Sequence, residues 1–113
     1  MKGVLLKRSG DGDKKRLSLI DGWLERFFEL KEGQLQYWRS EPDYTMGARG
    51  RLETGLQLKD YEILVDTSDP HWGFALQPKS ASGVRGWHLR ARSESDRLEW
   101  TQKLLLASML PDS

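Results

Sequence analysis

The C-terminal segment from Ser93 to Met109 constrains the fold more than any other part of the chain, because it predicts one uninterrupted amphipathic helix. Ser93 is a favourable N-cap, and acidic residues follow it in the first turn, where the helix dipole stabilises negative charge. Trp100, Leu104 and Ala107 recur at helical spacing and form one apolar face. A single helix cannot bury such a face against itself, so the preceding residues must provide a surface for it.

The chain before this helix consists of short β-prone segments separated by turn residues. The predicted strands cover residues 2–8, a short extension at 17–20, 23–31, 34–40, 48–54, 58–67, 72–78 and 84–92. Glu32-Gly33 is typical of a hairpin turn, and residues 41–47, which contain Pro42, are expected to form a loop. Closely spaced strands of this kind are typical of an antiparallel barrel or sandwich, and the final helix would close one of its ends.

Length and composition limit the class of protein. The 113 residues are expected to form one domain over 1–113, with strands within 2–92 and the helix over about 94–109. No apolar run approaches the roughly 18 residues of a membrane span. The absence of Cys excludes disulfides and a Cys nucleophile, and it suits a cytoplasmic protein. Neither His71 nor His88 lies in a nucleophile or metal motif, so we expect no catalysis, no cofactor and no metal site.

Basic residues are concentrated in the N-terminal half, although the net charge of the chain is only +1. Residues 1–51 carry eleven Lys and Arg against eight Asp and Glu, whereas residues 52–113 carry seven against nine. This polarity favours an anionic partner, and the competing interpretation is an ordinary solvated loop. A net charge of +1 with a pI near 8.0 argues against nucleic-acid binding.

Six segments occur in an order that matches one known family. Residues 2–7 contain a G-x-L-x-K motif, residues 23–30 a W-x-x-R-Φ-F-x-L motif and residues 33–38 a G-x-L-x-Y-Φ motif, where Φ is aromatic. Two further strand segments follow at 48–52 and 87–91, and the last segment, 91–100, leads into the helix with Trp100. On these motifs the chain resembles the pleckstrin-homology (PH) domain family over nearly its whole length. The resemblance implies a mainly β fold: a seven-stranded, partly open antiparallel barrel of two near-orthogonal sheets, capped by one C-terminal α-helix.

The same resemblance implies a lipid site at the open mouth of the barrel, opposite the helix. Lipid-binding members hold a phosphoinositide head group with a Lys that ends the first strand and with K/R-x-R on the second, because phosphates suit charge-assisted hydrogen bonds. Lys7 fills the first position and Arg26 the last, and both lie on the inferred inward faces of their strands. The further candidate ligands are Lys14, Lys15 and Arg16 in the following loop, Arg49, and the hydroxyl of Tyr37. For Tyr37 a core position is the competing interpretation.

Leu24 departs from the pattern, because the family's lipid binders place Lys or Arg there and this chain adds Glu25 beside it. An apolar side chain at that position weakens a stereospecific phosphate pocket. We therefore expect weak to moderate phosphoinositide binding by a peripheral membrane module of the cytoplasm.

The alternative is a protein-interaction domain of the adaptor type without specific lipid binding, because the same fold also serves protein partners. Trp38, which faces away from Leu35 and Tyr37, and Trp72 beside His71 are the candidate partner surfaces. Partial burial of both indoles under neighbouring loops is the competing interpretation.

Overall fold

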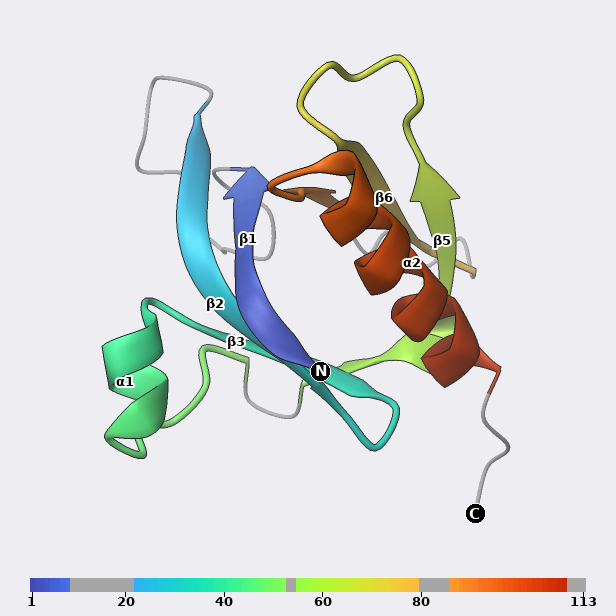
Figure 1. The fold of residues 1–113 in the computed structure, drawn as a ribbon. Helices are drawn as coiled ribbons and strands as arrows, with labels where there is room; N and C mark the ends of the chain where they lie inside the picture. Colours follow the sequence, from blue (N-terminus) through green and yellow to red (C-terminus); the bar gives the residue numbers. More distant parts are fainter. Residues whose placement is uncertain (9–21, 53–54, 80–85, 110–113) are drawn as a thin grey trace.

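Seven antiparallel strands form one continuous sheet in the order β4-β3-β2-β1-β7-β6-β5, and a C-terminal helix lies across it (Figure 1). The structure, a computed structural model, describes residues 1–8, 22–52, 55–79 and 86–109. Its strands are β1 (Lys2–Arg8), β2 (Trp23–Lys31), β3 (Gln34–Trp38), β4 (Leu56–Gln57), β5 (Tyr61–Val65), β6 (Gly73–Pro78) and β7 (Trp87–Arg90). Its helices are α1 (Glu41–Thr45), the 3-10 turn η1 (Leu58–Asp60) and α2 (Glu94–Ser108). Within these ranges, no helix is long and apolar enough to cross a bilayer.

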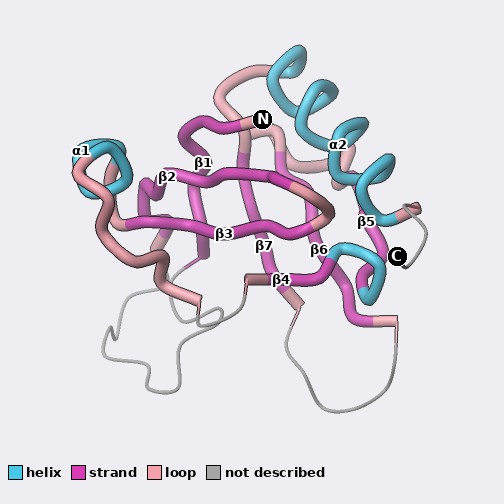
Figure 2. Tube along the Cα trace, turned by 90° about the horizontal axis from the view of Figure 1, so that it is seen from below, coloured by secondary structure: helices cyan, strands magenta, loops and turns pink. Residues whose placement is uncertain are grey.

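The sheet curls because β1 is shared between its two halves. It pairs with β2 over its whole length, but it pairs with β7 only at Leu6 and Lys7, opposite Arg90 and Leu89. Beyond this short ladder β1 and β7 diverge, and β2 and β3 cross β6 and β7 at a steep angle (Figure 2). The predicted seven-stranded, partly open fold with a C-terminal helix is confirmed, and the two expected sheets are joined into one.

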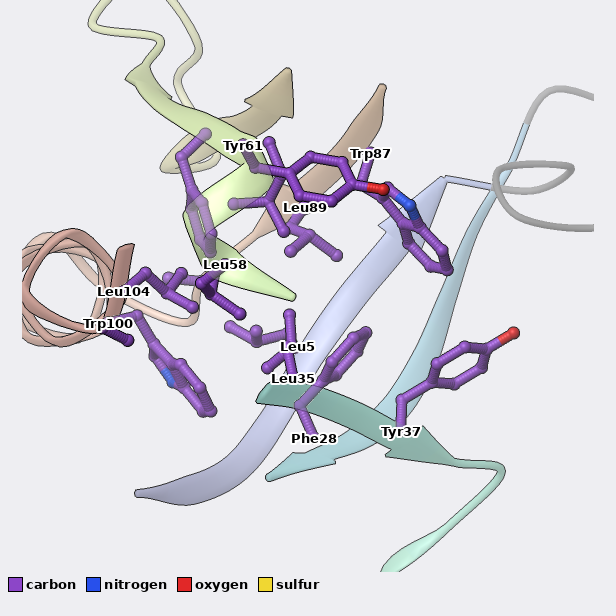
Figure 3. Close-up of a cluster of buried hydrophobic side chains, with 14 residues drawn as sticks. Leu5, Phe28, Leu35, Tyr37, Leu58, Tyr61, Trp87, Leu89, Trp100 and Leu104 are labelled. Atoms are coloured by element: carbon purple, nitrogen blue, oxygen red, sulfur yellow. The ribbon is translucent and has the colours of Figure 1, made fainter. Parts of the chain in front are cut away.

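Alternation along the strands gives the curled sheet one apolar inner face. The buried core comprises Leu5, Phe28, Leu35, Tyr37, Leu58, Tyr61, Phe74, Leu76, Trp87, Leu89, Ala91, Trp100, Leu104 and Ala107. Figure 3 shows that Trp100 and Leu104 enter this core from α2, whereas Tyr37 and Trp87 lie at its opposite side. The inner face therefore has one end closed by the helix and another end, which we call the distal end, lined by aromatic rings.

Helix α2 begins as the sequence predicts. The Ser93 hydroxyl accepts a hydrogen bond from the Asp96 N–H at 3.1 Å, and the Asp96 carboxylate accepts one from the Arg92 N–H at 3.1 Å. The first bond satisfies a backbone donor that the first turn of a helix leaves free, and the second ties the residue before the N-cap to that turn. The predicted apolar face is confirmed, since Trp100, Leu104 and Ala107 are all buried.

The segment between β3 and β4 differs from the prediction. Residues 41–47 were expected to form a loop, but Ser40 caps a helical turn by accepting from the Asp43 N–H, and Pro42 favours the first turn of that helix. The strand predicted at 48–54 is wrong over residues 48–52. Gln36 explains this, because its side-chain amide donates to the Leu52 carbonyl at 2.6 Å and accepts from the Leu52 N–H at 2.8 Å. A side chain thereby takes the place of a backbone partner at Leu52.

The strands predicted at 2–8 and 23–31 are confirmed with the same bounds, and the strands predicted at 34–40, 58–67, 72–78 and 84–92 are shorter in the structure. The hairpin between β2 and β3 turns at Glu32 and Gly33, which both have positive φ, of 54° and 77°. That pair of dihedrals matches the right-handed twist of a tight hairpin. The strand predicted at 58–67 begins with the 3-10 turn η1 and becomes β5 only at Tyr61. The short extension predicted at 17–20 lies outside the described residues.

Replacing the buried indole of α2 tests its role in the fold. Trp100→Ala should lower the free energy of unfolding by about 3–5 kcal/mol, because Trp100 is only 1% exposed and no neighbour can fill its volume. Leu98→Ala is the matched control, since Leu98 lies on the same helix and is 57% exposed. Denaturant unfolding followed by circular dichroism should show a change within about 0.5 kcal/mol for this control. Equal losses in both variants would contradict the assigned role.

Candidate functional site

Lys7 is the central residue of the distal end. Alternation along β1 places it on the inner face, where it is 1% exposed. Its Nζ lies 5.8 Å from the ring centroid of Tyr37 and 5.5 Å from that of Trp87, and it donates to the Arg8 carbonyl at 3.3 Å. An ammonium ion removed from water is costly, and cation–π contacts with two rings offset part of that cost.

Three strands supply this aromatic cage, which we define as Tyr37, Trp87 and the Lys7 ammonium between them. Tyr37 comes from β3 and Trp87 from β7, and their rings meet edge to face at 5.7 Å. Phe28 supports Tyr37 from below, with stacked rings at 5.3 Å. Tyr37 therefore acts as a core residue, as the competing interpretation held. The sequence analysis missed Trp87, although its inward alternation with Leu89 was a usable signal.

Arg26 lies beside Lys7 on the same face of the sheet. The residue opposite Arg26 on β1 is Leu5, and Lys7 is two residues further along that strand, so the two cations are diagonal neighbours. Arg26 is partly exposed, and its Nη1 donates to the Glu25 carbonyl at 2.9 Å. Within the described part of the chain it has no carboxylate partner. The guanidinium is therefore held by a backbone oxygen alone and keeps most of its donors free.

Leu24 occupies the position directly opposite Lys7 in the same register. Its side chain is 36% exposed. Leu24 therefore presents an apolar side chain at the edge of the distal end, where the lipid-binding pattern has a cation.

Arg49 is the one of the other candidate ligands that lies within the described residues, and it is not gathered at this point. Arg49 is exposed in the segment after α1, and none of the contacts described for it joins it to Lys7 or Arg26. That segment runs beside β3, where the Arg51 N–H donates to the Tyr37 carbonyl at 2.8 Å. The remaining candidates, which are Lys14, Lys15 and Arg16, lie outside the described residues.

Trp38 is not an exposed partner surface, and here the structure corrects the prediction in favour of burial. Its side chain is 9% exposed, and its Nε1 donates to the Ala48 carbonyl at 2.8 Å. Tyr44 of α1 covers it edge-on, with ring centroids 4.7 Å apart. Because the sequence analysis took residues 41–47 as a loop, it missed the helix that provides this cover.

Trp72 is the second predicted partner surface, and it lines a groove. The groove has a volume of about 470 Å³ and opens where β1 and β7 diverge. Its apolar walls are Val4, Leu6, Trp72 and Ala91, and its polar rim is Glu25, His71, Arg90 and Arg92. Trp72 has a φ of 59°, in the left-handed region, which costs an aromatic residue about 1–2 kcal/mol. The surrounding loop must therefore hold it in place.

Asp69 organises that loop. Its carboxylate accepts from the His71 N–H at 2.9 Å and from Arg90 Nε at 2.9 Å. The Arg90 guanidinium in turn stacks on Trp23 at 4.0 Å, which links β7 to β2. A Cβ at position 73 would collide with the Asp69 carboxylate, so glycine is required there. The sequence analysis did not predict these partners of Arg90.

Burial of Asp69 alone would raise the pKa of its carboxyl group, but the contributions that lower this pKa have a larger sum. Hydrogen bonds from the His71 N–H and Arg90, with the positive charges of both residues, lower the pKa below its ordinary value. A carboxylate with a depressed pKa stabilises the folded state above its unfolded-state pKa, and this stabilisation is lost as the pH falls through the folded-state pKa.

Removing this carboxylate tests the role of the loop. Asp69→Ala should lower the free energy of unfolding at pH 7 by about 2 kcal/mol, because two hydrogen bonds to a charged acceptor disappear. Denaturant titrations should show the difference from the wild type shrinking as the pH falls below about 4. Glu62→Ala is the control, since Glu62 is an exposed carboxylate on neighbouring β5. A pH-independent difference would argue against the assigned charge state.

Comparison with known proteins agrees with this geometry. A relative from Danio rerio, Pleckstrin homology domain-containing family A member 8, is 30% identical over 100 residues, which are 88% of this chain and 15% of that protein. The chain thus spans a small part of the length of that relative. The solution structure of the PH domain of human TBC1 domain family member 2 protein matches 100% of this chain and 87% of its own, with a TM-score of 0.72 at 22% identity.

A third match comes from a multidomain fragment. The crystal structure of human RhoA in complex with the DH/PH fragment of PDZRHOGEF contains a chain that matches 96% of this one, over 28% of its own length, with a TM-score of 0.69 at 19% identity. These structures support the fold alone. The family model described as PH domain matches residues 1–109. The chain therefore belongs to the PH-domain family.

Proposed function

We propose that the distal end binds phosphoinositide head groups weakly to moderately, and that this domain acts as a non-catalytic, peripheral membrane module of the cytoplasm. PH domains are generally non-catalytic modules for lipid or protein interactions. The observation that carries the proposal is the placement of Lys7 and Arg26 on one face of adjacent strands, where the Arg26 guanidinium is bound, among the described residues, only to the Glu25 carbonyl. A phosphate oxygen would be a stronger acceptor for that guanidinium than a carbonyl.

The limited number of available cations sets the strength of binding. Tyr37 and Trp87 enclose Lys7, so Arg26 is the accessible cation of these two residues. Each basic residue near an anionic bilayer contributes on the order of 1 kcal/mol. The exposed Leu24 beside them adds an apolar contact at the membrane interface. Membrane recruitment by this site alone is therefore weak. A second membrane anchor in the same protein would raise the overall affinity, because it increases the effective concentration of this site at the membrane.

Vesicle co-sedimentation tests the proposal. Arg26→Gln should reduce binding to phosphatidylcholine vesicles that contain a phosphatidylinositol bisphosphate by about five-fold, which corresponds to about 1 kcal/mol. Lys103→Gln is the charge-matched control, because Lys103 is an exposed cation on α2, at the other end of the core. Equal pelleting of the wild type and both variants would exclude the site.

A protein partner is the second candidate function, and the groove beside Trp72 favours it. The groove combines apolar walls with a mainly basic rim, which suits an apolar side chain in an acidic segment of another protein. The RhoA complex named above shows a DH/PH fragment in a protein assembly. A Trp72→Ala variant that binds vesicles normally but loses a protein partner would favour this function over lipid binding.

A further inference from the structure

Helix α1 is a small cover over an aromatic patch on the outer face of the sheet. Figure 1 shows it beside β2 and β3, away from α2 and from the core. Under it lie Phe27, which is 4% exposed, and Trp38, which is 9% exposed. None of the five residues of α1 is itself buried. A helix this short has little stability of its own, so its side-chain contacts decide whether it stays docked.

Tyr44 provides most of those contacts. Its ring lies 4.9 Å from that of Phe27 and 4.7 Å from that of Trp38, measured between centroids. Its hydroxyl donates a 2.6 Å hydrogen bond to Glu29 Oε2 on β2. The hydrogen bond to Glu29, with partial desolvation and the negative charge of the same carboxylate, raises the pKa of Tyr44. The hydrogen bond that ties α1 to β2 therefore requires a neutral phenol, which donates to a carboxylate.

Tyr44 is also the accessible tyrosine of this chain, which has three. Tyr37 is 4% exposed and Tyr61 is 8% exposed, and both belong to the core. Tyr44 is partly exposed, and Met46 just after it is 84% exposed. An enzyme that modifies tyrosine can therefore reach position 44 by undocking α1, whereas reaching the other two requires opening the core.

We propose that Tyr44 is a phosphorylation site for a protein-tyrosine kinase, and that phosphorylation undocks α1 from Phe27 and Trp38. In this reaction the phenol oxygen attacks the γ-phosphorus of ATP, and the bond between the γ-phosphorus and the β,γ-bridging oxygen breaks. ADP leaves with that oxygen, and the phenolic proton is released through the base of the kinase. This proposal does not depend on lipid binding at the distal end.

The charges around Tyr44 explain why the modification would undock the helix. The phosphate ester oxygen has no proton to donate to Glu29, and the added group carries about 1.5–2 negative charges at pH 7. It would lie against the Glu29 carboxylate from β2, and the same short helix also carries the negative charges of Glu41 and Asp43. The neighbouring cation is Lys2 of β1, whose Nζ lies 5.2 Å from the Tyr44 ring centroid. Repulsion from three carboxylates outweighs attraction to one ammonium.

The site is tested by treating this chain with the catalytic domain of a broad-specificity protein-tyrosine kinase and MgATP, followed by mass spectrometry of its peptides. We expect one phosphate, on Tyr44, and about a ten-fold loss of incorporation in Tyr44→Phe, since the two remaining tyrosines lie in the core. Tyr44→Phe keeps the ring contacts that hold α1, so the variant should fold. No incorporation, or preferential phosphorylation of Tyr37 or Tyr61, would overturn the site.

Undocking is tested separately by amide hydrogen exchange. Phosphorylated protein should exchange the amides of residues 41–47 about ten-fold faster than unmodified protein, with unchanged exchange in β1 and β7. Glu29→Gln removes one of the three repelling charges, and the acceleration on phosphorylation should be smaller in that variant. Unchanged exchange after phosphorylation, or exchange that increases across the whole sheet, would contradict the release of α1.

Discussion

Burial of the α2 indole against a curled sheet is the constraint on which the rest of this structure depends. Trp100 can be covered only where two halves of a sheet converge, and the shared strand β1 produces that convergence. Because α2 occupies one end of the core, the inward positions at the other end cannot pack against a helix. Those positions are filled by Tyr37 and Trp87, which together enclose the ammonium of Lys7.

The enclosed Lys7 has two roles that oppose each other. Desolvation of its ammonium costs free energy, and the rings of Tyr37 and Trp87 recover part of it. That arrangement fixes the ends of β1, β3 and β7 relative to one another. It also removes the charge from direct contact with solvent, so Arg26, which lies diagonally across the β1–β2 ladder, is the accessible cation of this pair. A lipid site built in this way is preorganised but contributes few charges.

Local patterns in the sequence predicted the parts of the structure that local forces decide. Period-two alternation placed Leu5, Lys7 and Leu89 on the inner face, and helical spacing with the Ser93 cap placed Trp100. Prediction failed where a side chain from a distant segment provides the hydrogen-bond partner. The Gln36 side chain bonds both backbone groups of Leu52, and Arg90 pairs with Asp69, which lies twenty-one residues away in the chain. Such pairings depend on the folded sheet and have no signature in residue spacing.

The five tryptophans are explained by the same division between core and periphery. Trp87 and Trp100 belong to the core, whereas each of the other three has a specific partner: Arg90 stacks on Trp23, the Ala48 carbonyl accepts from Trp38, and the pinned Asp69 loop holds Trp72 in a left-handed conformation. The contacts that fix Trp72 and Trp38 differ in number. The Trp72 loop is tied by arginines from β7 and from α2, while the cover over Trp38 depends on one phenol and one carboxylate. The proposed change of charge at Tyr44 would therefore expose Trp38 without disturbing the core.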